Sequence, residues 1–138
     1  MIWSNGGITD RSIYEDSVFA KILLNDGLME KQDYETYLSL FHNMSNFMRK
    51  PTLLVHLHVT PEESMRRIKL RSRDCESGIS INYLRKLYDE YEDHFIPEIS
   101  KSVNVLVIDW SEFKDEEQVA RKIKEEYEKI SNVRRVTF

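Results

Sequence analysis

Five cations fall within the eight residues from Arg66 to Arg73, and no acidic residue interrupts them. Arg67 and Arg71 stand four residues apart, which places both on one face of a helix. Because a planar guanidinium holds two phosphate oxygens at once, such a segment suits a clamp that closes over phosphates. The spacing alone leaves an alternative open, since a run of charges is more often a solvent-facing helix surface.

A clamp of this kind normally works with a glycine loop of the form GxxxxGK[ST], whose backbone amides cradle the phosphates. These 138 residues contain no such loop. The four glycines are Gly6, Gly7, Gly27 and Gly78, and none of them precedes a lysine. The sequence therefore supplies the cations of a phosphate site without the loop that usually accompanies them.

A shorter polar motif lies between a possible strand end and a helix start, at Asp10, Arg11 and Ser12. An aspartate there could hold a metal-bound water, and an arginine could orient a hydroxyl or a phosphate. The alternative is a helix cap with a surface ion pair. Asp16 follows on the next helix, where it either hydrogen-bonds a polar ligand or faces solvent.

Two histidines, His56 and His58, alternate along an apolar run and so share one face of a strand. They could be two ligands of a metal ion, but no third ligand stands out in the sequence. We therefore favour a structural role for this pair.

The elements that position these residues alternate between helices and short apolar strands. We predict helices over residues 13–24, 33–48, 81–95 and 115–130, a further helix starting at Thr60 and Pro61, and strands over residues 53–59 and 103–108. Pro97 is expected to end the helix that covers residues 81–95. Residues 6–9 are either the end of a short strand or a loop.

This order of elements predicts an α/β fold with a parallel sheet. Ligands of such sheets bind at the carboxyl ends of the strands. The rule points to residues 10–12, 59–63 and 109–113 as the segments that carry a site.

Composition narrows the function classes. The chain has 138 residues, enough for one domain with a buried core, and 41% of them are hydrophobic. Its net charge of −4 and its pI of about 5.6 argue against a general nucleic-acid binder. No apolar run reaches the ~20 residues that span a membrane. A single cysteine, Cys75, allows no internal disulfide, which favours a reducing compartment: the cytoplasm, with the mitochondrion as an alternative.

Three motifs together resemble one family, the deoxynucleoside kinases. Residues 10–21 are similar to the family's D/E-R-S segment and the helix after it, and residues 67–79 to its lid. Residues 83–92 resemble the helix that follows the lid. The resemblance implies a three-layer parallel sheet with flanking helices, related to thymidylate kinases and to P-loop kinases. It also implies one domain over residues 1–138, with a lid at about residues 66–80.

The resemblance implies an activity, the transfer of the γ-phosphate of ATP to the 5′-hydroxyl of a deoxynucleoside. On the acceptor side, Asp10 would lie near the reacting hydroxyl and, indirectly, near a magnesium ion. Arg11 would position that hydroxyl and the transferring phosphate. Asp16 would hydrogen-bond the nucleobase, and Glu76 would accept a hydrogen bond from the sugar 3′-hydroxyl.

On the donor side, the resemblance implies that Arg67, Arg71 and Arg73 clamp the ATP phosphates as the lid closes. Glu112 and Phe113 would contact the adenine of ATP, largely through the backbone. Asp10, Arg11, Arg71 and Arg73 would then form the catalytic set. Closure of arginines over phosphates excludes water and supplies the charge stabilisation that phosphoryl transfer requires.

The family also begins with a strand, a glycine loop, a helix and a general-base glutamate, and none of these precedes Asp10. We expect the chain to correspond to the carboxyl-terminal two thirds of such a kinase, with an incomplete sheet. Helices 13–24 and 33–48 resemble the family's dimer surface, which implies a homodimer. The alternatives are a non-catalytic dimerisation or partner module derived from a kinase, and a thymidylate-kinase-like nucleotide kinase.

Overall fold

The computed structural model describes residues 6–71, 73, 76, 78–127, 129 and 133–136. The chain divides into two compact units, Met1–Met48 and Arg49–Phe138, and each is described by itself. No helix in the described ranges is both long and apolar enough to cross a bilayer.

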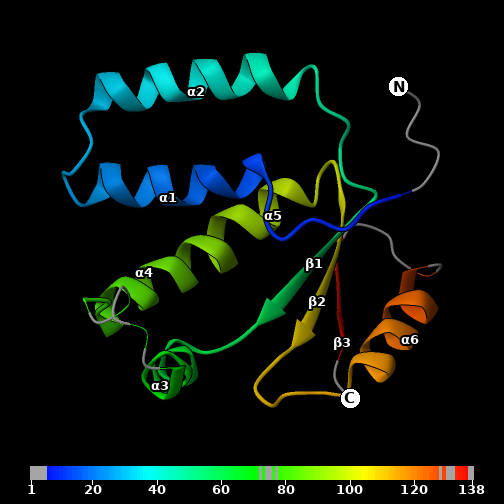
Figure 1. Cartoon of the computed structure of the whole chain (residues 1–138). Helices are drawn as coiled ribbons and strands as arrows, with labels where there is room; N and C mark the ends of the chain where they lie inside the picture. Colours follow the sequence, from blue (N-terminus) through cyan, green and yellow to red (C-terminus); the bar gives the residue numbers. More distant parts are fainter. Residues whose placement is uncertain are drawn as a thin grey trace. The chain divides into compact units, whose positions relative to one another are not determined.

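The first unit is a hairpin of two helices, α1 (Ile13–Asn25) and α2 (Lys31–Ser45), which run antiparallel (Figure 1). Helix α1 begins after Ser12, whose backbone N–H donates to the Glu15 carboxylate, one half of a capping box. Gly27, with φ of 70°, turns the chain between the helices. The predicted helix 13–24 is confirmed, whereas the second helix begins and ends earlier than the predicted range 33–48.

The second unit contains a parallel sheet of three strands, β1 (Leu53–His58), β2 (Asn104–Asp109) and β3 (Val133–Val136), in the order β1-β2-β3. Its register pairs His56 with Val107 and His58 with Asp109. The two predicted strands are confirmed as β1 and β2, whereas β3 was missed. Residues 6–9, left open between strand and loop, form a loop.

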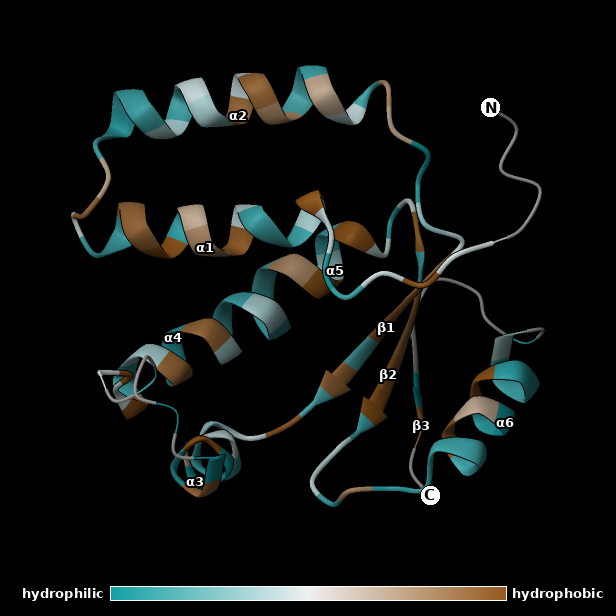
Figure 2. Ribbon diagram, in the orientation of Figure 1, coloured by the Kyte–Doolittle hydropathy of each residue, from teal (hydrophilic) through white to brown (hydrophobic). Residues whose placement is uncertain are grey.

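Helices cover both faces of this sheet (Figure 1). They are α4 (Ile81–Glu90), the π-helical turn η2 (Tyr91–Phe95), α5 (Ile96–Ile99) and α6 (Glu116–Tyr127), whereas α3 (Pro61–Arg71) follows β1 and packs against α4. One face carries Leu106 and Ile108, which pack against Val119 and Ile123 of α6. The side chains that alternate with these point to α4 and η2. Figure 2 shows the resulting apolar centre in β1 and β2.

The helix predicted over residues 81–95 does not end at Pro97, and this expectation was wrong. The chain stays helical to Ile99 through the π-helical turn η2, in which the Ile96 N–H donates to the Tyr91 carbonyl. A proline lacks an N–H and crowds the carbonyl four residues before it, here that of Asp93. A widened turn accommodates both effects without ending the helix. It also carries Glu92, which lies close to β1.

Candidate functional site: an arginine that joins the lid helix to the loop after β2

The loop after β2 is tied down at its first residues. The Trp110 N–H donates to the His58 carbonyl, with 2.8 Å between nitrogen and oxygen, so the loop starts against the end of β1. One carboxylate oxygen of Asp109 accepts from both the backbone N–H and the hydroxyl of Ser111, which closes a turn. These hydrogen bonds lower the pKa of Asp109. The loop therefore has a fixed start at the carboxyl ends of two neighbouring strands.

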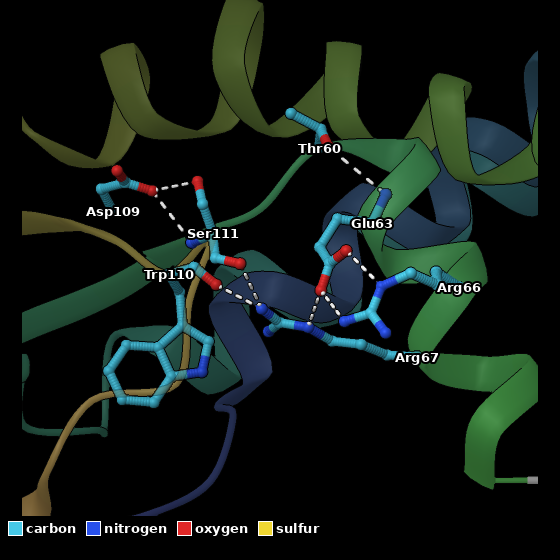
Figure 3. Close-up of polar contacts among 7 residues, drawn as sticks. All are labelled: Thr60, Glu63, Arg66, Arg67, Asp109, Trp110 and Ser111. Carbon is cyan, nitrogen blue, oxygen red and sulfur yellow. Dashed lines mark hydrogen bonds and ion pairs between the residues drawn. The ribbon is translucent and has the colours of Figure 1, made fainter.

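Arg67 of α3 reaches this loop (Figure 3). Its Nη2 donates to the backbone carbonyls of Trp110 and Ser111, at 2.7 and 2.9 Å. Its guanidinium carbon lies 4.3 Å from the centre of the Phe113 ring, which is a cation–π contact. One side chain thus joins the helix after β1 to the loop after β2.

Phe113 presents an open aromatic surface beside this contact. The side chain is 75% exposed, although the Arg67 guanidinium lies over its ring and Trp110 meets it edge-to-face at 6.3 Å. Glu112 is also exposed. An exposed ring held beside a cation offers a flat surface on which a planar base can stack.

Glu63 connects the arginines to each other. Its carboxylate accepts from Nε and Nη2 of Arg66, both at 2.7 Å, and from Nε of Arg67 at 2.6 Å. These hydrogen bonds hold the pKa of Glu63 at about 2. We call Glu63, Arg66, Arg67, Asp109 and Ser111 the Arg67 cluster. Glu63 was not singled out from the sequence, although its spacing of three and four residues from the two arginines would have predicted both contacts.

The rest of the predicted lid is more open. Arg71 forms an ion pair with Glu76, at 2.6 Å from its Nη2 and 3.2 Å from its Nε, and its side chain is 50% exposed. Arg73 is exposed. Residues 72, 74, 75 and 77 of the predicted lid lie outside the described residues. Two residues expected to bind different ligands, Arg71 and Glu76, thus bind each other in this structure.

Apart from Glu76, the residues predicted on the acceptor side lie in the first unit. Asp10 and Asp16 are exposed, and Arg11 has a left-handed backbone with φ of 65° and a guanidinium carbon 5.0 Å from the Phe19 ring centre. A positive φ at a residue with a side chain is strained and is found preferentially at functional positions. The Tyr37 hydroxyl is buried without a hydrogen-bond partner among the described residues. Burial and the nearby Asp16 charge raise its pKa.

The paired histidines lie in a second polar cluster, against α4 and η2. His58 Nε2 is 2.9 Å from the Tyr88 hydroxyl, and Glu92 Oε1 lies 3.6 and 3.7 Å from Nε2 of His56 and His58. Arg135 of β3 donates to the other Glu92 oxygen at 2.8 Å. We call these five residues the Glu92 cluster. Within the described part of the chain, no three His, Cys, Asp or Glu side chains are arranged to hold a metal ion.

The chain is similar to known proteins in both fold and sequence. The chain resembles the solved deoxyadenosine kinase from M. mycoides with bound dCTP, with a TM-score of 0.70 and 24% identity over 83% of this chain and 60% of that one. Its parallel sheet with flanking helices is therefore a P-loop kinase-like fold. The deoxynucleoside kinase family model matches residues 2–132. The chain belongs to the deoxynucleoside kinase family, which confirms the predicted family and fold class.

Two relatives from Dictyostelium discoideum show how far the similarity extends. A deoxyadenosine kinase is 54% identical over 131 residues, which are 94% of this chain and 53% of the relative. A deoxyguanosine kinase is 36% identical over 110 residues, 80% of this chain and 39% of the relative. The chain thus spans about half the length, or less, of these curated relatives.

Proposed function

We propose that this chain forms the donor-nucleotide and lid portion of a deoxynucleoside kinase, which phosphorylates the 5′-hydroxyl of a deoxynucleoside with ATP. The observation that carries the proposal is the exposed Phe113 ring, fixed beside Arg67 at the carboxyl ends of β1 and β2. In parallel α/β sheets this edge is where ligands bind. Family membership supplies the reaction class.

We infer that residues of the second unit would bind both ends of ATP. Phe113 and the backbone near Glu112 would receive the adenine, and the exposed Arg71 and Arg73 would receive the phosphates. ATP supplies the phosphoryl group when bound. Phosphoryl transfer depends on alignment and charge stabilisation, which the two lid arginines provide by closing over the phosphates. Magnesium would enter with the nucleotide, and Asp10 would reach it through water.

On the acceptor side, Asp16 would bind the base and Arg11 would orient the 5′-hydroxyl. Glu76 would bind the 3′-hydroxyl, which requires it to leave Arg71. The same step frees Arg71 for the phosphates, so binding of both substrates would open one ion pair. The relative with 54% identity supports deoxyadenosine as the first substrate to test. We place this activity in the cytoplasm.

The test is transfer of labelled phosphate from ATP to each of the four deoxynucleosides by the purified 138-residue chain. Thymidine monophosphate serves as a further acceptor, because a thymidylate-kinase-like enzyme would prefer it. Arg71→Ala excludes a contaminating kinase. Transfer that Arg71→Ala abolishes would show that these residues form a phosphate site without the glycine loop. No transfer by a folded chain would contradict kinase activity of these 138 residues alone and would favour a partner module.

The partner module remains a second candidate because the first unit exposes large apolar side chains. Leu40 and Met44 of α2 are 58% and 51% exposed, and Phe47 just beyond it is 92% exposed. Exposed apolar residues concentrated on one element favour association. We propose a homodimer formed through α1 and α2. Sedimentation of the wild type against a Leu40→Glu, Phe47→Glu double variant tests it, and a wild type that is monomeric at micromolar concentration contradicts it.

A further inference from the structure

We propose that Glu63 is a positioning residue of the donor-nucleotide site. Its carboxylate orients Arg67, and Arg67 connects helix α3 to the loop from Asp109 to Phe113. The inference rests on the proposed function, because it assumes that the loop from Asp109 to Phe113 receives the base of ATP. It gives Arg67 a role different from the phosphate clamp that the resemblance implied.

Three kinds of contact hold the Arg67 guanidinium. Nε is bound to Glu63 and Nη2 to two backbone carbonyls of the loop. The face of the guanidinium lies on Phe113. These contacts orient the guanidinium toward the loop. Figure 3 shows its hydrogen bonds to Glu63, Trp110 and Ser111. Arg67 is thereby placed at the base end of the nucleotide, whereas Arg71 and Arg73 serve the phosphate end.

Glu63 is itself held in place by hydrogen bonds of its backbone and its side chain. Its backbone N–H donates to Oγ1 of Thr60, the cap of α3, at 3.3 Å. Glu63 is therefore fixed in the first turn, where the helix leaves β1. Its carboxylate binds Arg66 with a two-point contact and still accepts from Arg67. A planar two-point contact fixes the carboxylate plane, and Arg67 takes its direction from that plane.

The negative charge of Glu63 lies between two positive charges. Two guanidinium groups, of Arg66 and Arg67, meet at one carboxylate. Without that negative charge the two cations would repel each other, and only two neutral carbonyls and the Phe113 ring would hold Arg67. Glu62, the preceding residue, binds Arg85 instead. It provides a matched control on the same helical turn.

The experiment compares Glu63→Gln and Glu62→Gln in the full chain by calorimetric titration with ATP and with inorganic tripolyphosphate. We expect Glu63→Gln to weaken ATP binding about tenfold while tripolyphosphate binding changes less than twofold, because the lost contact serves the base. Glu62→Gln should leave both unchanged. Glu63→Asp, which keeps the charge on a shorter side chain, should recover part of the ATP affinity.

A second readout does not depend on ligand. The Arg67 Nε–H should give a distinct, slowly exchanging NMR signal that Glu63→Gln removes and Glu62→Gln preserves. Equal losses for ATP and tripolyphosphate would overturn the proposal and return Arg67 to the phosphate clamp. ATP binding that Glu63→Gln does not weaken would overturn the role of Glu63 alone. A wild type that binds no ATP would overturn the proposed function, and with it this role, whatever the NMR signal.

Discussion

The second unit contains two polar clusters that differ in how their charges are balanced. In the Arg67 cluster both oxygens of Glu63 accept hydrogen bonds from arginines, and the arginines stay charged at any physiological pH. In the Glu92 cluster one oxygen is bound by Arg135, while Oε1 is buried and has no hydrogen bond among the described residues. Two histidine nitrogens lie 3.6 and 3.7 Å from that oxygen.

The Arg67 cluster keeps its charges at neutral pH, whereas the charges of the Glu92 cluster change with pH. The low pKa of Glu63, about 2, keeps the Arg67 cluster in one charge state across the neutral range. Burial lowers the pKa of His56, although Glu92 opposes this shift. The Arg67 cluster, which we propose holds the loop after β2, is thus built from fixed charges, whereas the Glu92 cluster depends on the protonation of His56.

Replacement of Arg67 should give the largest effect on the first cluster. Arg67→Ala removes three hydrogen bonds and the contact with Phe113, so we expect ATP binding to weaken roughly 10- to 100-fold, the equivalent of about 1.5–3 kcal/mol for charge-assisted hydrogen bonds. Titration calorimetry measures it. Arg66→Ala is the comparison and should give a smaller loss, because Arg66 fixes the Glu63 carboxylate but has no hydrogen bond to the loop in Figure 3. Similar losses for both variants would contradict a specific role for Arg67.

Replacement of Glu92 should give the largest effect on the second cluster. Glu92→Gln keeps the shape but removes the charge that Arg135 binds, and the Glu92 side chain is only 15% exposed. We expect the free energy of unfolding to fall by about 1–2 kcal/mol, measured by urea denaturation at pH 7.5. Glu98→Gln, in an exposed pair with Lys101, should change it by less than about 0.5 kcal/mol. A neutral result for Glu92→Gln would show that the buried charge is not stabilising.

The Glu92 cluster should also respond to pH through His56. Because burial lowers its pKa in the folded state, the unfolded chain binds the proton more readily once pH falls below about 6.5. Stability from the neutral histidine is therefore full above that pH and is lost as pH falls toward the folded pKa. The loss cannot exceed about 1.4 kcal/mol per pH unit.

The groups around the histidines determine how much of this loss is seen. Glu92 favours protonation of His56, whereas His58 and Arg135 oppose it. Asp109 at the end of β2 faces His58, and Lys114 lies near Asp109. Asp89 and Asp93 act on the neighbouring Tyr88. Urea denaturation at pH 7.5, 6.5 and 5.5 should show falling stability for the wild type and a weaker slope for His56→Gln. Equal slopes would assign the dependence to other groups.

The sequence predicted the parts of this unit that rest on local pattern. The apolar runs at Leu53–His58 and Asn104–Asp109 are too short for helices and too apolar for loops, so their assignment as buried strands was correct. Strand β3 was not predicted because Arg134 and Arg135 separate its two valines, so the segment is no apolar run. The helix end predicted at Pro97 was wrong because a π-helical turn accommodates the proline, and no local sequence pattern predicts such a turn.

The site shows the same limit. Arg67 was singled out by its spacing, but its partners lie 43 and 44 residues away, so its direction depended on the fold. The pairing of Arg71 with Glu76 was equally hidden, because the resemblance assigned each residue to a different ligand. For Asp10, Arg11 and Asp16 the roles implied by the resemblance remain predictions.

The smallest effects we predict are those of replacing the cap residues of α3 and α4. Thr60 Oγ1 accepts from Glu63 N–H at the start of α3, and Ser80 Oγ accepts from Tyr83 N–H at the start of α4. Thr60→Ala and Ser80→Ala should each lower the free energy of unfolding by about 0.5–1 kcal/mol, measured by urea denaturation.

Only Thr60→Ala should also weaken ATP binding, by about twofold, because only this cap fixes the turn that carries Glu63. Stability and binding would then separate between two substitutions of the same kind. If both variants left ATP binding unchanged, the hydrogen bonds of Glu63 to its arginines would suffice to hold Arg67, and the cap would serve the helix alone. If Ser80→Ala weakened binding as much as Thr60→Ala, the effect would come from general loss of stability, and the distinction between a site-forming cluster and its supporting fold would fail.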